Sequence, residues 1–140
     1  MILPDKSSDE THFFSSEVSM RWESDGRICV LDLHSSSRSA IDVWYEAIKA
    51  IAQDWNPDQI FLAAYDLKDV TLTPYFKQRA TDVANAVRHL QGRYAVIIGN
   101  DPNSETMRHF FDSAVKQQSS REGKIFPGSA SALFWLQEAL

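Results

Sequence analysis

Four side chains that could do chemistry stand at or just after the carboxyl ends of predicted strands: Asp32, His34, Asp66 and Asp101. In an open parallel sheet these strand ends share one rim, which is where ligands bind. The carboxylates could hold a hard cation through oxygen ligands, or a pair of these groups could act as general acid and base. Asp also caps helices and shapes turns at such places, so capping is the default interpretation of the rim.

Two threonines of the segment 66–74 form a second candidate site. Thr73 followed by Pro74 is typical of a helix N-cap and the first helical residue. Free amides and the helix dipole at such a place favour negative charge, so Thr73 or Thr71 could accept a phosphate, and the added charge would change a partner surface. We expect capping to be the main role of Thr73. The predicted partner surface consists of Lys68, Asp69, Thr71, Thr73 and Tyr75.

Several kinds of chemistry have no signal in the 140 residues. The sequence contains no glycine-rich dinucleotide loop, Walker-type loop, nucleophile elbow or zinc-protease motif, so we predict no cofactor and no metal. The single cysteine, Cys29, stands between Ile28 and Val30 and is interpreted as a small buried hydrophobic residue. We therefore expect a non-enzymatic protein.

The charge pattern and the hydropathy argue against some classes of partner and some cellular locations. The net charge is −5 and no stretch forms a basic stripe, which argues against nucleic acid as a partner. No apolar run approaches the roughly 18 residues of a membrane span, and the first residues lack the pattern of a secretion signal. We expect a cytoplasmic protein that does not insert into a membrane.

Apolar periodicity predicts the elements that must position these residues. Alternating or continuous apolar runs predict strands at residues 18–22, 27–34, 60–66, 94–98 and 124–126. Apolar residues that recur every three or four positions predict helices between residues 39 and 55, 74 and 92, 101 and 115, and 129 and 140. A hairpin at Asp25-Gly26 joins the first two strands.

This order, β-β-α-β-α-β-α-β-α, predicts a single α/β domain with a mainly parallel five-stranded sheet and an antiparallel edge strand. Residues 1–15 are expected to be a mobile tail, and residues 16–140 form the domain. The strands 60–66 and 94–98 are apolar on both faces, so both faces of the sheet should be covered. If the helices cover mainly one face, we expect the segment with Phe13 and Phe14, or a second copy of the chain in a homodimer, to shield the other.

The layout resembles the SpoIIAA-like group, which comprises STAS domains and short bacterial STAS/SEC14-like proteins. The similar segments are residues 124–127 (KIFP), 132–136 (ALFWL) and Gly92–Ile97 (GRYAVI), and the likeness of layout covers roughly residues 17–140. STAS domains act in protein–protein signalling, often as antagonists of anti-sigma factors, and a partner kinase phosphorylates a Ser or Thr after the central strand. The Asp-Ser of that family is absent here, and Thr71 or Thr73 stands in its place.

The resemblance implies a non-enzymatic, cytoplasmic interaction module of bacterial type with a protein partner. The first alternative is a carrier of a small apolar, lipid-like ligand, because SEC14-like relatives hold lipids, and an apolar cavity of several hundred Å³ would favour it. The second alternative is a metal-assisted enzyme, which would require the four rim side chains to meet.

Overall fold

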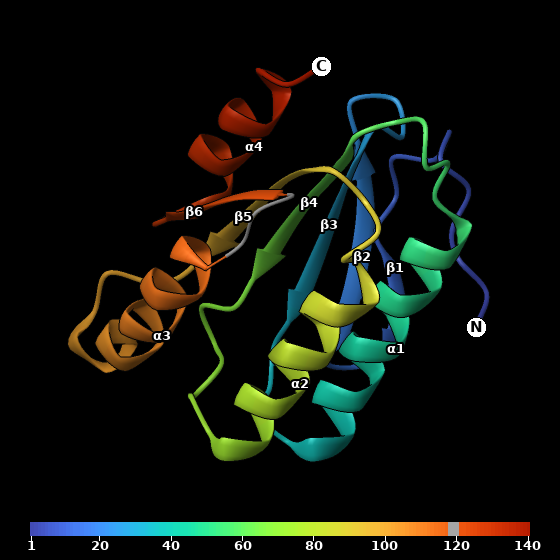
Figure 1. The fold of residues 1–140 in the computed structure, drawn as a ribbon. Coiled ribbons are helices and arrows are strands. Elements are labelled where there is room, and N and C mark those ends of the chain that lie inside the picture. Colours follow the sequence, from blue (N-terminus) through green and yellow to red (C-terminus); the bar gives the residue numbers. More distant parts are fainter. Residues whose placement is uncertain (118–120) are drawn as a thin grey trace.

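The alternating strands and helices of the sequence form one mixed sheet of six strands with helices on both faces (Figure 1). The computed structural model describes residues 1–117 and 121–140. The elements follow one another along the chain as β1 (His12–Ser15), β2 (Val18–Glu23), β3 (Ile28–Leu33), α1 (Arg38–Asp54), β4 (Phe61–Asp66), α2 (Pro74–Ala86), β5 (Gly92–Ile97), the 3-10 turn η1 (Pro102–Ser104), α3 (Glu105–Lys116), β6 (Arg121–Phe126) and α4 (Ser129–Gln137).

The strands lie in the sheet in the same order as in the chain, β1-β2-β3-β4-β5-β6. β1, β2 and β3 pair antiparallel, whereas β3 to β6 pair parallel. The predicted α/β class is therefore confirmed, but the prediction of five strands is wrong. The additional strand, β1, lies inside the segment predicted as a tail, and it takes the edge position predicted for residues 18–22. It is only four residues long, which is too short to show a period in the sequence.

The first face of the sheet carries α1, α2 and α3 (Figure 1). Trp44 of α1 stacks on Phe76 of α2, with the ring centroids 5.6 Å apart, and Phe76 meets Phe111 of α3 edge-on at 6.3 Å. These rings lie on the inward faces of three different helices, so their burial holds the helices to the sheet and to one another.

The second face is covered by α4, which packs across β4, β5 and β6. Trp135 lies against Phe126 with ring centroids 5.5 Å apart, and Leu136 is fully buried. The expectation that Phe13 and Phe14 shield this face is wrong. Phe14 packs against the core of the first face, and the side chain of Phe13 is 63% exposed.

The residues that precede β1 contact two tryptophans of the first-face core. The carbonyl of Pro4 accepts a hydrogen bond from the indole N–H of Trp22 (3.1 Å), and the ammonium of Lys6 lies 4.9 Å from the ring centroid of Trp55. A Cβ at Gly26, whose φ is +78°, would come within 2.6 Å of the Lys6 Cβ. Gly26 therefore allows the positive φ that the turn requires, and its lack of a side chain leaves room for Lys6.

Two side chains fix where the first long helices begin. The Ser37 hydroxyl accepts a hydrogen bond from the Ala40 amide (3.2 Å), and the Thr73 hydroxyl accepts one from the Phe76 amide (3.1 Å). The capping role predicted for Thr73 is confirmed, with Pro74 as the first helical residue. Of the helices within the described ranges, none has the length and apolar character needed to cross a membrane.

Candidate functional site

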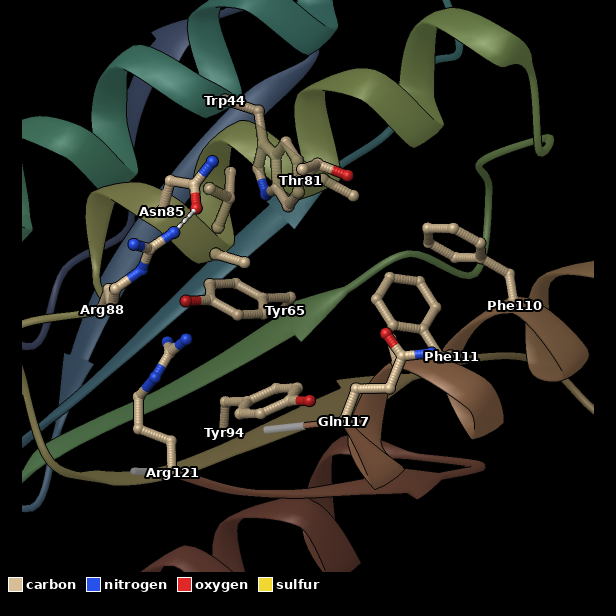
Figure 2. A pocket seen from close by; sticks show the side chains of 14 residues that line it. Trp44, Tyr65, Thr81, Asn85, Arg88, Tyr94, Phe110, Phe111, Gln117 and Arg121 are labelled. Atoms are coloured by element: carbon tan, nitrogen blue, oxygen red, sulfur yellow. Dashed lines mark hydrogen bonds between the residues drawn. The ribbon is translucent and has the colours of Figure 1, made fainter. Parts of the chain in front are cut away.

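A cavity of about 470 Å³ lies on the first face of the sheet, between α2, α3 and the strands β4 to β6 (Figure 2). Its volume falls in the range of roughly 300–1,000 Å³ that is usual for small-molecule pockets. Aromatic and small apolar side chains form much of the wall. The polar side chains that line it are Tyr65, Thr81, Asn85, Arg88, Tyr94, Gln117 and Arg121.

Three neighbouring strands supply the floor of the cavity. Tyr65 of β4, Tyr94 of β5 and Arg121 of β6 all project from the first face. Tyr94 pairs with Gly123 of β6, and a Cβ at Gly123 would lie 2.2 Å from the Tyr94 Cζ. Because Gly123 has no side chain, the Tyr94 ring can occupy this position on the floor of the cavity.

Three buried polar groups at the cavity have no hydrogen-bond partner among the residues that the structure describes. They are the indole N–H of Trp44 and the hydroxyls of Tyr65 and Tyr94. The side chains are 1%, 5% and 5% exposed, respectively. Figure 2 shows the indole nitrogen of Trp44 directed toward Tyr65, and the two hydroxyls directed to different sides of the floor. A buried polar group without a partner costs about 1–3 kcal/mol, so three at one cavity require an explanation.

Burial also fixes the protonation state of the two phenols. It raises the pKa of Tyr65 and the pKa of Tyr94 above the ordinary value, because the low-dielectric surroundings disfavour the phenolate. Both hydroxyls therefore stay protonated at neutral pH. They can donate a hydrogen bond to an acceptor in the cavity, but they cannot serve there as bases.

The charged residues among the described lining are two arginines, Arg88 of α2 and Arg121 of β6, and none is acidic. Arg121 is 7% exposed, and its guanidinium lies 5.6 Å from the centroid of the Tyr94 ring. Burial lowers the pKa of Arg121, and the neighbouring Tyr65 and Tyr94 act in the opposite direction; an arginine stays charged at neutral pH under such shifts. Arg88 is exposed and donates to the side-chain carbonyl of Asn85.

The other end of the cavity is apolar. Phe110 and Phe111 of α3 lie edge to face with ring centroids 5.0 Å apart. Ala80 of α2 and Ala114 of α3 leave free volume because their side chains are single methyl groups. The cavity therefore has a cationic, donor-rich end and an aromatic end, as an amphipathic molecule would require.

The predicted rim brings two of its four residues together. Asp32 of β3 pairs with Asp66 of β4 in the parallel register, and both project from the second face. Burial raises the pKa of Asp32, and the neighbouring Asp66 raises it further. Arg21 lies 3.6 Å from Asp32 and Lys68 lies 3.4 Å from Asp66, so both carboxylates are ion-paired.

The other two rim residues are engaged with other partners. His34 pairs with Asp69 (3.2 Å), and Asp101 is exposed with its carboxylate near the Ser104 hydroxyl (3.2 Å). Within residues 1–117 and 121–140, no three His, Cys, Asp or Glu side chains lie close enough to hold a metal ion. The four predicted residues therefore do not converge, and the metal-assisted alternative gains no support.

The loop predicted as a partner surface adjoins this rim. The Thr71 amide donates to the Ser36 hydroxyl (2.7 Å), and Thr71 itself is exposed. The Tyr75 hydroxyl donates to Asp42, which also binds Arg79 at 3.0 Å, so Tyr75 ties α2 to α1. The use of this loop by a protein partner, and phosphorylation at Thr71 or Thr73, stay predictions.

Cys29 is fully buried, as predicted, with its sulfur 3.6 Å from the carbonyl oxygen of Leu62. Burial raises the pKa of its thiol to about 12. A thiol of that pKa in the core is not a nucleophile at neutral pH.

The cavity itself is absent from the sequence-based predictions. Tyr65 and Tyr94 stand in apolar strands, where the pattern indicates core residues. Arg121 gave no signal either, because it precedes the strand predicted at residues 124–126, whereas β6 begins at Arg121. Comparison of the chain with protein-family models, curated proteins and solved structures found no match. The resemblance to STAS domains therefore has no independent support.

Proposed function

We propose that this protein binds a small amphipathic molecule in the cavity between α2, α3 and the sheet. The observation that carries the proposal is the set of three buried polar groups that have no hydrogen-bond partner among the described residues, around about 470 Å³ of space. Buried donors are normally satisfied, and a bound ligand with acceptor atoms would satisfy Trp44, Tyr65 and Tyr94 together. This agrees with the ligand-carrier alternative, for which a cavity of this size is the distinguishing observation.

The residues of the cavity favour binding over chemistry. No Cys, His, Asp, Glu or Lys occurs among the described lining residues. The groups present are phenols with raised pKa values, an indole N–H, guanidinium groups, a threonine hydroxyl and side-chain amides, none of which exchanges protons readily at neutral pH. Such groups orient an acceptor and exclude water around it.

A calorimetric titration with a defined probe tests the proposal. We suggest 2-naphthoate, a rigid aromatic anion of about a dozen non-hydrogen atoms, for which roughly 0.3–0.5 kcal/mol per atom corresponds to a dissociation constant between about 10 µM and 1 mM. The matched pair of variants is Ala114→Phe, which fills the cavity from α3, and Ser113→Phe, which places the same ring at an exposed neighbouring position.

The expected result is binding by the natural protein and by Ser113→Phe, with binding lost in Ala114→Phe. Circular dichroism of both variants confirms that they fold. Equal affinity in Ala114→Phe and Ser113→Phe would place the probe outside the cavity and contradict the proposal. Absence of binding to the natural protein by this probe and by its neutral analogue 2-naphthalenemethanol would also contradict it.

A further inference from the structure

The distribution of charge in the cavity indicates which class of molecule it receives. Arg88 and Arg121 lie at one end, and no described acidic residue lines the space. Figure 2 shows the guanidinium groups of these two arginines on the same side of the Tyr65 ring, with the Tyr65 hydroxyl directed between them. Phe110 and Phe111 lie on the other side of the cavity. One end is thus suited to an anion and the opposite end to an apolar body.

The hydrogen-bonding groups at the cationic end are mainly donors. A guanidinium and an indole N–H donate only, and the Tyr65 hydroxyl, which is directed between the two arginines, donates as well as accepts. The side-chain carbonyl of Asn85, one of the few acceptors, already receives a hydrogen bond from Arg88. An excess of donors matches a head group that only accepts, which is the property of an ionised acid.

The apolar surroundings set the charge of that acid. Arg121 is 7% exposed and Tyr65 is 5% exposed, so a head group seated between them leaves water. The cost of desolvating an anion rises steeply with its charge. Of the two guanidinium groups, that of Arg121 is buried and that of Arg88 lies at the exposed margin. These conditions favour a monoanion over a dianion. The fork of an arginine fits a carboxylate with two parallel hydrogen bonds.

We infer that the ligand is an aromatic carboxylate, whose head group lies between Arg121 and Arg88 beside the Tyr65 hydroxyl and whose ring lies against Phe110 and Phe111. The inference rests on the proposed function and adds the chemical class of the ligand. Aromatic rings packed at the far end favour offset or edge-to-face contact with a flat ring system over a flexible chain.

The test compares probes that share one ring and differ in the head group: 2-naphthoate, 2-naphthalenemethanol and 2-naphthyl phosphate. The full-length protein is titrated with each by calorimetry at neutral pH. We expect 2-naphthoate to bind about 10- to 100-fold more tightly than the neutral alcohol, which is the ratio expected for charge-assisted hydrogen bonds. We expect the phosphate dianion to bind more weakly than the carboxylate.

Substitutions of Arg121 and Arg88 test whether these two side chains bind the carboxylate. Arg121→Gln should reduce the affinity for 2-naphthoate by about 10- to 100-fold and Arg88→Gln by a few-fold, because Arg88 is exposed and screened by solvent. Arg121→Lys should retain part of the affinity, since it keeps the charge but loses the planar fork. Arg27→Gln, an exposed arginine of the β2–β3 turn, is the matched control and should leave the affinity unchanged.

The outcomes separate this inference from the proposed function. Equal binding of the carboxylate and the alcohol, unaffected by Arg121→Gln and Arg88→Gln, would overturn the carboxylate assignment and leave the binding function standing. Tighter binding of the phosphate would overturn the preference for a monoanion. Absence of binding by every probe would overturn both proposals. If Arg121→Gln fails to fold, Arg88→Gln against Arg27→Gln decides the question.

Discussion

Replacing Tyr65 or Tyr94 by phenylalanine removes a single buried hydroxyl and no protein hydrogen bond, because neither hydroxyl has a partner among the described residues. The side-chain ring and its packing remain. An orphaned polar group costs about 1–3 kcal/mol, and water inside the cavity offsets part of that cost. We therefore expect each variant to raise the free energy of unfolding of the empty protein by about 1 kcal/mol, or to leave it unchanged.

Tyr75→Phe is the matched control, because its hydroxyl is bonded to Asp42 and lies 3.3 Å from the Arg79 Nε. The same chemical change there should lower the free energy of unfolding by about 1 kcal/mol. Urea denaturation followed by circular dichroism gives these values, with equal slopes required for the comparison.

Tyr65→Phe should also bind 2-naphthoate more weakly than the natural protein, although it is no less stable, because the Tyr65 hydroxyl lies beside the proposed position of the head group. A loss of 1 kcal/mol or more in Tyr65→Phe and Tyr94→Phe, equal to that of Tyr75→Phe, would show that the hydroxyls have protein partners. That result would refute the reasoning on which the cavity is assigned as a binding site.

Three further predictions concern the floor of the cavity, the rim and the core thiol. Gly123→Ala should lower the free energy of unfolding by about 1–3 kcal/mol and weaken probe binding, because its Cβ would displace the Tyr94 ring. Gly128→Ala adds a Cβ with nothing within 4 Å, so it should lower the free energy of unfolding by no more than about 1 kcal/mol, the cost of Ala at the N-cap of α4. Equal effects of the two variants in urea denaturation would contradict the packing argument. Asp32→Asn should raise the free energy of unfolding at pH 7. The pKa of the Asp32 carboxyl is higher in the folded than in the unfolded protein, so this carboxyl lowers stability as the pH rises from the unfolded pKa through the folded pKa. The gain should vanish below the unfolded pKa, near pH 3, and a gain that persists there would contradict the assigned cause. The Cys29 thiol, with a pKa of about 12, should react with iodoacetamide at pH 8 only after unfolding in urea, and rapid labelling of the native protein would disprove its burial.

Most of the fold could be predicted from the sequence, because the spacing of its apolar residues distinguishes helices from strands clearly. The stripe that includes Trp44 gives α1, and the Thr73-Pro74 pair marks the start of α2. The start of α1 was harder to place, since several serines can cap a helix there. The predicted helix begins at residue 39, but Ser37 accepts the capping hydrogen bond and α1 begins at Arg38. β1 could not be predicted, because Phe13 and Phe14 point to opposite faces of a four-residue edge strand.

The rim was predictable in part and the cavity was not. Asp32 and Asp66 meet because parallel neighbours end at one edge, a rule that the sequence pattern can use. The cavity arises from how far α2 and α3 stand apart over Tyr65 and Tyr94, which depends on side-chain packing between distant segments. Apolar periodicity marks a residue as inward but does not say whether its polar atom finds a partner.

The most direct test of ligand entry into the cavity is a ¹H–¹⁵N correlation spectrum of the labelled protein, in which each of the four tryptophans gives an indole signal. The indole N–H of Trp44 has no partner among residues 1–117 and 121–140 and lies at the cavity, while those of Trp22 and Trp55 are bonded to the carbonyls of Pro4 and Gln59 at 3.1 and 3.2 Å. Trp135 lies on the opposite face. Titration with 2-naphthoate should shift the Trp44 signal, assigned with Trp44→Phe, and leave the other three in place. A saturable shift of another tryptophan with Trp44 unmoved would contradict the proposed site.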